Sequence, residues 1–452
     1  MITVANAAGF LGDRLDAAKA IVESAHVDVL TLEYLAELTL SILTRAKQKD
    51  PALGYARDFL EVIRSIKPAV RNQSQLRIVT NAGGVNVPAC AAAVAANLRD
   101  ELADFPIATV TGDDILPSLE ELKNAGQTFA NLDTGQPLTE LAQPVLSANV
   151  YMGAQPIVDS LDGGARLVLT GRVADASLTV GPAWHHFGWS ADQWNELCGA
   201  TIAGHLIECG AQVTGGYSTQ WQQASGDIGY PIAEISRDGS AVVTKPPGSG
   251  GRVDRLSVTE QLVYEIGDPS RYLTPDVVAD FTSVQLASVG ANRVAVTGAR
   301  GMPAPDTWKV SLSYHAGYRA TAQLLVFGRD CLTKAQRCSE LIQQRMQSAN
   351  AKPHEFHTEL LGAGGAVPGL VEPPIDIPEV MLRMTVCDPQ REIVARFTKE
   401  IAPLITAGPA GLAGYASGRS QVQSVIAYWP TLIPKSFIDP QVEIRTAQDW
   451  SD

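Results

Sequence analysis

Positively charged residues are sparse in this chain and form no cluster. Charged residues make up 18% of the 452 residues, and 48 acidic side chains outnumber 35 Lys and Arg, for a formal net charge of -13. A phosphate backbone is repelled by such a protein unless a local basic groove exists, and the sequence has no run of Lys or Arg that could form one. We therefore expect no nucleic-acid partner.

Long apolar runs are also missing. No segment reaches the roughly 18 uninterrupted apolar residues that read as a membrane span, and the first residues, MITVANAAGFLGDRLDAAK, lack the basic segment, apolar run and cleavage site of a secretory signal. The sequence predicts a soluble, cytoplasmic protein that does not enter a membrane.

Cysteine patterns and familiar catalytic motifs are absent as well. The six cysteines include no CxxC pair, so the sequence indicates neither a disulfide framework nor a Cys-rich zinc module. No GxSxG elbow is present, and no Walker loop or dinucleotide fingerprint can be found. Nucleophilic serine chemistry and tightly bound redox cofactors thus receive no support.

What the chain does contain is a globular composition with repeated strand-helix units. Hydrophobic residues make up 45% of it, and its length favours two domains. Short apolar runs at 2–8, 27–33, 76–82, 107–112, 145–151 and 165–171 predict strands. Amphipathic stretches at 14–25, 35–48, 88–103 and 155–163 predict helices between them. This order is typical of a parallel sheet, so we predict an α/β domain over residues 1–285, doubly wound or barrel-like.

The pattern changes after residue 285. Strands are predicted at 284–298, 307–328 and 380–388, and amphipathic helices at 332–347 and 389–405. Strand pairs followed by a helix indicate a smaller α+β domain with a mostly antiparallel sheet over residues 286–452. An oligomer-forming or pocket-closing role suits this second domain, and a homo-oligomer is expected.

Polar side chains follow the predicted strands. Ligands of parallel α/β proteins bind at the carboxyl ends of the strands. The residues expected there as substrate-binding groups are Asp13, Arg14, Glu33, Asn81, Tyr151 and Arg172, with Asp113 and Asp114 after the fourth strand. Although Asn, Asp and Gly are common in any turn, the whole set favours a site.

The segment GRVADAS supplies Arg172 and Asp175 in one loop. Arg172 suits the binding of a carboxylate or a thioester oxygen, and Asp175 suits a general base if burial raises its pKa. Alternatively, the two side chains pair with each other and only brace the loop.

The segment TIAGHLIECG is predicted to be a helix that presents His205, Glu208 and Cys209 on one face. His205 and Glu208 are catalytic candidates, and a divalent metal ion on this face is left open because imidazole, thiolate and carboxylate are all metal ligands. The alternative is a packed core face, with Cys209 as a small apolar filler. Arg172 is the expected partner of Glu208.

Glycines also precede a predicted helix in PPGSGGRVDRLSVTE, where Ser257 and Glu260 have the spacing of a capping box. Exposed N–H groups at such a place bind anions, so Gly248, Gly250 and Gly251 are anion-binding candidates, with a plain flexible turn as the alternative. Just before them, 230–245 predicts a strand pair with Asp238-Gly239 at its turn.

Several long strings give the chain a resemblance to a known family. They are GFLGDR, TNAGG, GRVADAS, AGHLIECGAQVTGG, GYPIAEI, VTEQLVYEIGDPSRYLTPDVV, GPAGLAGYASGRS and YWPTLIPKSFI. The chain resembles the acyclic terpene utilisation protein A family over most of residues 1 to 440. The family takes its name from bacterial pathways that degrade citronellol and geraniol through acyl-CoA thioesters, and it has members outside those pathways. The resemblance implies a bacterial catabolic enzyme that acts on a carboxylate or its CoA ester. It implies no established mechanism, and marks Asp13, Arg14, Asn81, Arg172, Asp175, His205 and Glu208 as pocket residues.

Three hypotheses follow. The first is a lyase, hydratase or hydrolase that acts on a small carboxylate or acyl-CoA by general acid–base chemistry. The second is a non-catalytic acyl-CoA-binding or accessory protein of a catabolic enzyme complex, and the third is a scaffold whose C-terminal domain mainly builds an oligomer.

Overall fold

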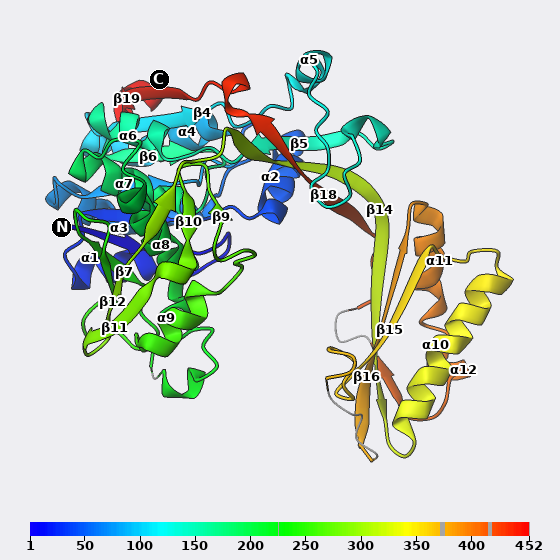
Figure 1. The fold of residues 1–452 in the computed structure, drawn as a ribbon. Helices are drawn as coiled ribbons and strands as arrows, with labels where there is room; N and C mark the ends of the chain where they lie inside the picture. The colour runs from blue at the N-terminus through cyan, green and yellow to red at the C-terminus, as the bar shows by residue number, and fades with distance from the viewer. Residues whose placement is uncertain (225, 371–375, 415–417, 452) are drawn as a thin grey trace. The chain divides into compact units, whose positions relative to one another are not determined.

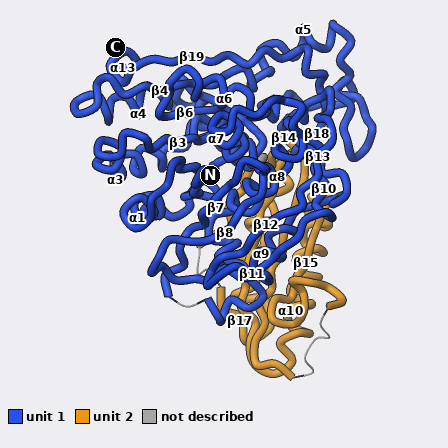
Figure 2. The backbone as a smooth tube through the Cα atoms, turned by 60° about the vertical axis from the view of Figure 1, so that its left-hand side comes forward, with its two compact units in different colours: residues 1–313, 428–452 blue, residues 314–427 orange. Residues whose placement is uncertain are grey.

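The computed structural model describes residues 1–224, 226–370, 376–414 and 418–451. The chain forms two compact units (Figure 2): residues 1–313 with 428–452, and residues 314–427. The sequence predicted a division at residue 285, with one continuous second domain to residue 452. The roles expected for that second domain stay predictions, and residues 415–417 of the GPAGLAGYASGRS string lie outside the described residues.

The first unit is built on a large mixed sheet (Figure 1). Its centre is parallel, in the spatial order β1 (Ile2–Asn6), β2 (Val29–Leu32), β3 (Arg77–Thr80), β6 (Leu167–Thr170) and β4 (Pro106–Thr111). Antiparallel strands extend it beyond β1, as β7 (Ile232–Ile235), β8 (Ala241–Thr244), β12 (Arg293–Thr297) and β11 (Gln285–Gly290), and beyond β4, as β19 (Gln441–Thr446). The described strand pairings run from β11 at one edge to β19 at the other. Of the two predicted architectures, doubly wound sheet and barrel, the structure therefore has the open sheet.

One predicted strand lies outside this sheet. The segment 145–151 does form β5 (Val145–Val150), but β5 pairs with β14 (Thr307–Phe327), which also pairs with β18 (Gln423–Pro434). The prediction that all six strands line up in one parallel sheet is therefore wrong for β5. The residues after β5 still contact the loop after β6, because Met152 forms an isolated parallel bridge with Val173.

Helices cover both faces of the large sheet. One set packs in sequence as α1 (Ala17–Ser24), α3 (Asp58–Asn72), α4 (Val87–Leu102) and α13 (Ala447–Ser451), and the other as α6 (Gln155–Asp162), α7 (Ser177–Phe187) and α8 (Trp194–Glu208). Successive strand residues point to opposite faces. Accordingly Ala5 belongs to the same apolar cluster as Phe59 of α3, whereas the adjacent Val4 is buried outside that cluster.

The connections change faces at the middle of the sheet. The neighbouring strands β3 and β6 lead into α4 and α7 respectively, which belong to different helix layers. In open α/β sheets a crevice forms at the carboxyl ends where such connections diverge. The loops that follow β3 and β6 are therefore where the fold predicts a ligand site.

The first unit contains further short elements. They are α2 (Glu37–Lys49), α5 (Leu119–Asn124), α9 (Arg255–Leu262), and a small sheet of β13 (Arg300–Met302), β10 (Val278–Asp280) and β9 (Tyr272–Leu273), with short 3-10 turns at Leu138–Glu140, Gly210–Gln212, Trp221–Gln223, Phe281–Ser283 and Lys435–Phe437.

The second unit contains an antiparallel sheet in the order β15 (Glu355–Leu361), β16 (Glu379–Asp388), β14 and β17 (Leu412–Gly414). The segment 284–298, which the sequence analysis placed in the second domain, instead forms β11 and β12 of the large sheet. Helices α10 (Cys331–Ser348), α11 (Arg391–Glu400) and α12 (Leu404–Ala407) share one apolar cluster with it.

Two local predictions need correction and one is confirmed. Helix α9 begins two residues before Ser257, so its capping box joins Asp254 to Ser257 and leaves Glu260 out. Helix α3 was not predicted, because Pro68 lies inside it and an interior proline usually marks a helix boundary. The hairpin β7–β8 is present, with Gly239 in its turn at φ +79.

Candidate functional site

Arg172 occupies the loop after β6 and is almost completely buried, with 1% of its surface exposed. Its Nη1 donates to the carbonyl oxygen of Leu35 (2.5 Å) and to Oδ1 of Asp175 (2.6 Å). The guanidinium carbon lies 4.1 Å from the centre of the Tyr151 ring, close enough for a cation–π contact. The pairing of Arg172 with Asp175, one of the two sequence alternatives, is thus present in the structure.

A second carboxyl group lies against the same guanidinium. Oε1 of Glu33 is 3.6 Å from Arg172 Nη1 and accepts hydrogen bonds from Nδ2 of Asn81 (2.5 Å) and the backbone N–H of Leu35 (2.8 Å). Among the described residues, the buried Oε2 of Glu33 has no hydrogen-bond partner. Burial raises the pKa of Glu33 well above its ordinary value, and the negative charge of Asp175 raises it further.

Asp113, after β4, fixes the backbone of the Arg172 loop. Its Oδ2 accepts from the backbone N–H of Arg172 (2.9 Å) and from Nδ2 of Asn149 (2.8 Å). Burial raises the pKa of Asp113 to about 6, although both hydrogen bonds oppose the shift. Gly171 is required beside it, because a Cβ there would come within 2.2 Å of Asp113 Oδ1.

His205 and Glu208 form a hydrogen-bonded pair on α8. They are three residues apart, so they share a helix face as predicted, and Nδ1 of His205 lies 3.0 Å from Oε1 of Glu208. The sequence pointed to Arg172 as the partner of Glu208. The structure gives Glu208 the imidazole of His205 instead, because this neighbour is on the same helix face.

Both nitrogens of the His205 ring face oxygen atoms. Nε2 lies 2.9 Å from the carbonyl oxygen of Gln261, which only accepts hydrogen bonds, so Nε2 must carry a proton. Nδ1 then either donates a second proton to an ionised Glu208 or accepts one from a protonated Glu208. In both cases one proton is shared along the Nδ1–Oε1 contact.

The electrostatics of this pair match the geometry. Burial lowers the pKa of His205, but the hydrogen bond and charge of Glu208 outweigh burial and raise it overall. Burial raises the pKa of Glu208, and the contact with His205 only partly offsets this. Both groups therefore hold a proton more tightly than usual, and a carboxyl group that shares a proton with an imidazole is a common form of acid–base centre.

Arg172 and the His205–Glu208 pair open onto one cavity of about 440 Å³ within the first unit. That volume suits a small organic ligand. Five of the predicted residues line it: Tyr151, Arg172, Asp175, His205 and Glu208. The other walls are mostly apolar or aromatic and include Leu132, Leu273, Pro275, Trp308 and Leu432.

Sequence reasoning missed three titratable residues of this cavity, namely Glu265, Tyr272 and Lys309. Lys309 lies on β14, and its Nζ is 4.7 Å from the centre of the same Tyr151 ring that Arg172 contacts. Glu265 and Tyr272 both fall within the string VTEQLVYEIGDPSRYLTPDVV, so the family resemblance was the signal that could have singled them out.

Four of the predicted substrate-binding residues do not line the cavity: Asp13, Arg14, Glu33 and Asn81. Asp13 accepts from the N–H of Gly9 (2.8 Å) and the hydroxyl of Tyr230 (2.5 Å), which braces the loop after β1. Arg14 forms ion pairs with Asp16 (2.7 Å) and Asp227 (2.5 Å). A substrate-binding role for Asp13 and Arg14 stays a prediction.

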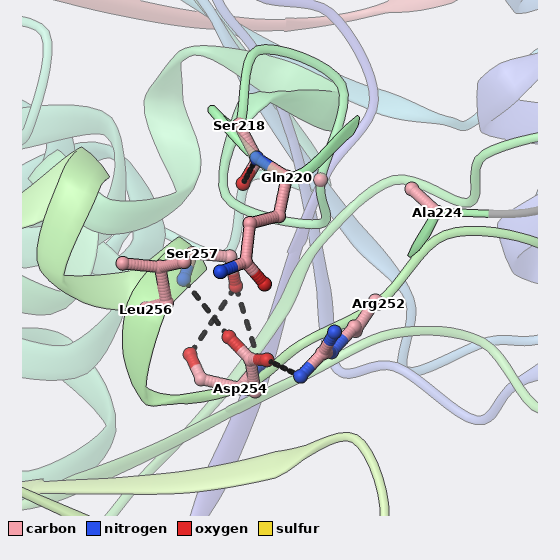
Figure 3. Close-up of a pocket in the computed structure, with 8 residues that line it drawn as sticks. Ser218, Gln220, Ala224, Arg252, Asp254, Leu256 and Ser257 are labelled. Atoms are coloured by element: carbon pink, nitrogen blue, oxygen red, sulfur yellow. Dashed lines mark hydrogen bonds and ion pairs between the residues drawn. The ribbon is translucent and has the colours of Figure 1, made fainter. Parts of the chain in front are cut away.

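Side chains at the N-terminus of α9 cap this helix and pair with each other (Figure 3). Asp254 caps the helix by accepting from the N–H of Ser257 (3.0 Å) and also pairs with Arg252. The pocket beside them has room for about one water molecule, at about 10 Å³. An anion at Gly248, Gly250 or Gly251 would therefore have to bind to backbone N–H groups of the preceding loop. Within that loop the N–H of Gly250 already donates to the carbonyl oxygen of Asp227 (2.8 Å). That role also stays a prediction.

The described residues contain no group of three or more His, Cys, Asp and Glu side chains placed to hold a metal ion. Cys209 ends α8, and burial raises the pKa of its thiol to about 12. In the described part of the chain, no helix combines the length and apolar character needed to cross a membrane.

Comparison with known proteins gives one match. The model of a family described as "Acyclic terpene utilisation family protein AtuA" matches residues 2–444. Searches of the curated proteins and of the solved structures found no match.

Proposed function

The chain belongs to the acyclic terpene utilisation AtuA family, and from this premise we propose that it is a catabolic enzyme acting on a carboxylate or acyl-CoA substrate. The family assigns the chain to acyclic terpene utilisation. The reaction class that we propose is lyase, hydratase or hydrolase chemistry by general acid–base catalysis.

One observation carries the proposal. A buried cation, Arg172, and a proton-sharing pair, His205–Glu208, line the same cavity. Titratable groups whose pKa values are displaced by burial and by one specific partner are characteristic of catalytic sites when they lie in a cleft.

The chemistry follows from these positions. Arg172 would hold the anionic oxygen of a carboxylate or the developing oxyanion of a thioester, which a buried guanidinium stabilises more strongly than water does. Glu208, supported by His205, would move a proton at the neighbouring carbon or at a water molecule. The apolar side chains of Leu132, Leu273 and Leu432 would contact the hydrocarbon part of the substrate.

The test uses simple probes of each reaction class. We expect the wild-type protein to catalyse either the hydration of 2-octenoyl-CoA or the hydrolysis of octanoyl-CoA. Glu208→Gln should lower kcat on the order of a hundredfold or more, with the melting temperature changed by only about a few degrees. The matched control Glu121→Gln removes an exposed carboxylate from α5 and should leave turnover unchanged. Equal activity in wild type and Glu208→Gln would refute the proposed role of the pair.

The accessory alternative has one observation in its favour. Arg172 is already paired with Asp175, as expected if these residues only brace the loop. Asp175→Asn separates the two hypotheses. An enzyme that uses Asp175 should lose turnover, whereas a binding protein with no turnover should still bind octanoyl-CoA in the variant.

A further inference from the structure

The acid–base pair has little direct access to solvent. The side chains of His205 and Glu208 are 4% and 15% exposed. If the pair works as proposed above, on which this inference rests, each turnover that leaves a proton on it or takes one from it must be followed by exchange with water.

The end of α9 is attached directly to His205. Gln261 accepts from Nε2 of His205 (2.9 Å) through its carbonyl oxygen, and its own Nε2 donates to the carbonyl oxygen of His205 (3.1 Å). The N–H of Tyr264 donates to the same carbonyl oxygen of Gln261 (3.1 Å). These contacts hold the turn after α9 against the pair.

Glu265 is the next residue of this turn. It lines the cavity together with His205 and Glu208 and is exposed to solvent. Its backbone has φ 58, in the left-handed region that a non-glycine residue seldom adopts. Such conformations persist where the surrounding structure enforces them, and they cluster at functional sites.

The other titratable groups facing the pair are less suited to exchange protons with water. Asp175, on the loop after β6, is bound to Arg172. Burial raises the pKa of Tyr272 on β9, and it raises that of Cys209 at the end of α8 to about 12. Both groups therefore keep their protons at neutral pH. Glu265 and Asp175 are the solvent-accessible carboxylates that contribute charge at His205 or Glu208, and Asp175 is held in an ion pair by Arg172.

We propose that Glu265 is a proton-relay residue that carries protons between bulk water and the His205–Glu208 pair. The Glu265 carboxylate takes a proton from hydronium or a buffer acid and passes it to the pair, which returns Glu265 to the carboxylate. The reverse order removes a proton from the pair. No electrons are transferred, and Glu265 acts through the pair.

The experiment measures the exchange of the His205 ring proton with water by NMR, in full-length protein labelled with [15N]histidine. His205→Gln assigns the signal among the seven histidines. We expect Glu265→Gln to slow this exchange by about tenfold or more, and added acetate to restore it. Glu265→Asp should keep much of the wild-type rate, because Asp retains the carboxylate and tolerates a left-handed backbone.

Two controls separate a relay from a structural effect. Glu265→Gly relieves the backbone strain but removes the carboxylate, so it should slow exchange as Glu265→Gln does. Glu121→Gln removes one remote exposed charge and should leave the rate unchanged. An unchanged rate in Glu265→Gln, a lack of rescue by acetate, or equal slowing in Glu121→Gln would each overturn the relay. Because no substrate is needed, this result is independent of the turnover assays that test the proposed function.

Discussion

Nδ1 of His205 lies 3.0 Å from Oε1 of Glu208, while Nε2 of the same ring faces the carbonyl oxygen of Gln261 at 2.9 Å. The carbonyl oxygen of Gln261 requires a proton on Nε2, and a second proton is shared between Nδ1 of His205 and Oε1 of Glu208. This arrangement makes the pair the centre of the acid–base chemistry that we propose.

The pKa of His205 should fall when its partner loses its charge. Burial alone lowers this pKa, and Glu208 is the main group that raises it above the ordinary value of 6.5. In Glu208→Gln we therefore expect the pKa of His205 to drop below 6.5. The NMR titration of the [15N]-labelled imidazole measures it, and a pKa at or above the wild-type value would show that Glu208 is not the controlling group.

The free energy of unfolding should depend on pH because of the same pair. A histidine whose folded-state pKa is raised contributes stability that is fully present below its unfolded value of 6.5 and is lost as pH rises through the folded-state pKa. Urea unfolding should thus show that the free energies of unfolding of wild type and His205→Gln differ less as the pH rises. A difference that grows toward alkaline pH would contradict this assignment.

Asp113 should make the protein less stable as pH rises from about 4 to above 6. Its folded-state pKa of about 6 exceeds the ordinary value of 3.8, so between these two pH values the folded state binds a proton more tightly than the unfolded state. The stability that comes from this tighter binding is lost as the pH rises through 6. Two pKa units correspond to about 3 kcal/mol at most. Asp113→Asn keeps an acceptor for the N–H of Arg172 and should remove this part of the pH dependence in urea unfolding. An identical pH profile in the variant would refute the shifted pKa.

Gly171 should resist even the smallest side chain. A Cβ there would lie 2.6 Å from Cγ of Asp113 and force that carboxylate away from the Arg172 backbone. We expect Gly171→Ala to lower the free energy of unfolding by about 1–3 kcal/mol. Gly267→Ala is the control, since a Cβ at Gly267 meets nothing within 4 Å and its φ is not positive. Equal stability of the two variants would mean that the contact with Asp113 is unimportant.

The sequence predicted local structure well and sheet membership less well. The alternation of apolar runs located the parallel strands, and the three-residue spacing predicted that His205 and Glu208 share a face. The membership of β5 was not predictable in this way, because its partner β14 lies far along the chain and strand pairing depends on tertiary contacts.

The same limit applies to the site. Tyr151, Arg172, Asp175, His205 and Glu208 were predicted because each stands in a loop after a predicted strand or on one helix face. Lys309 and Glu265 come from β14 and from the turn after α9, and only tertiary packing brings them to the cavity. Asp13 shows the converse, since a polar residue after a strand can serve to fix its own loop.

The most direct test of the account is isothermal titration calorimetry of octanoate and octanoyl-CoA against wild type, Arg172→Lys and Arg172→Met. If Arg172 holds the anionic group of the ligand, at least one probe should bind the wild-type protein. Its affinity should fall by about tenfold or more in Arg172→Met, with a smaller loss in Arg172→Lys because the charge is kept but the bidentate geometry is lost. Binding to folded Arg172→Met with unchanged affinity would contradict the central claim that this cavity recognises an anion through Arg172.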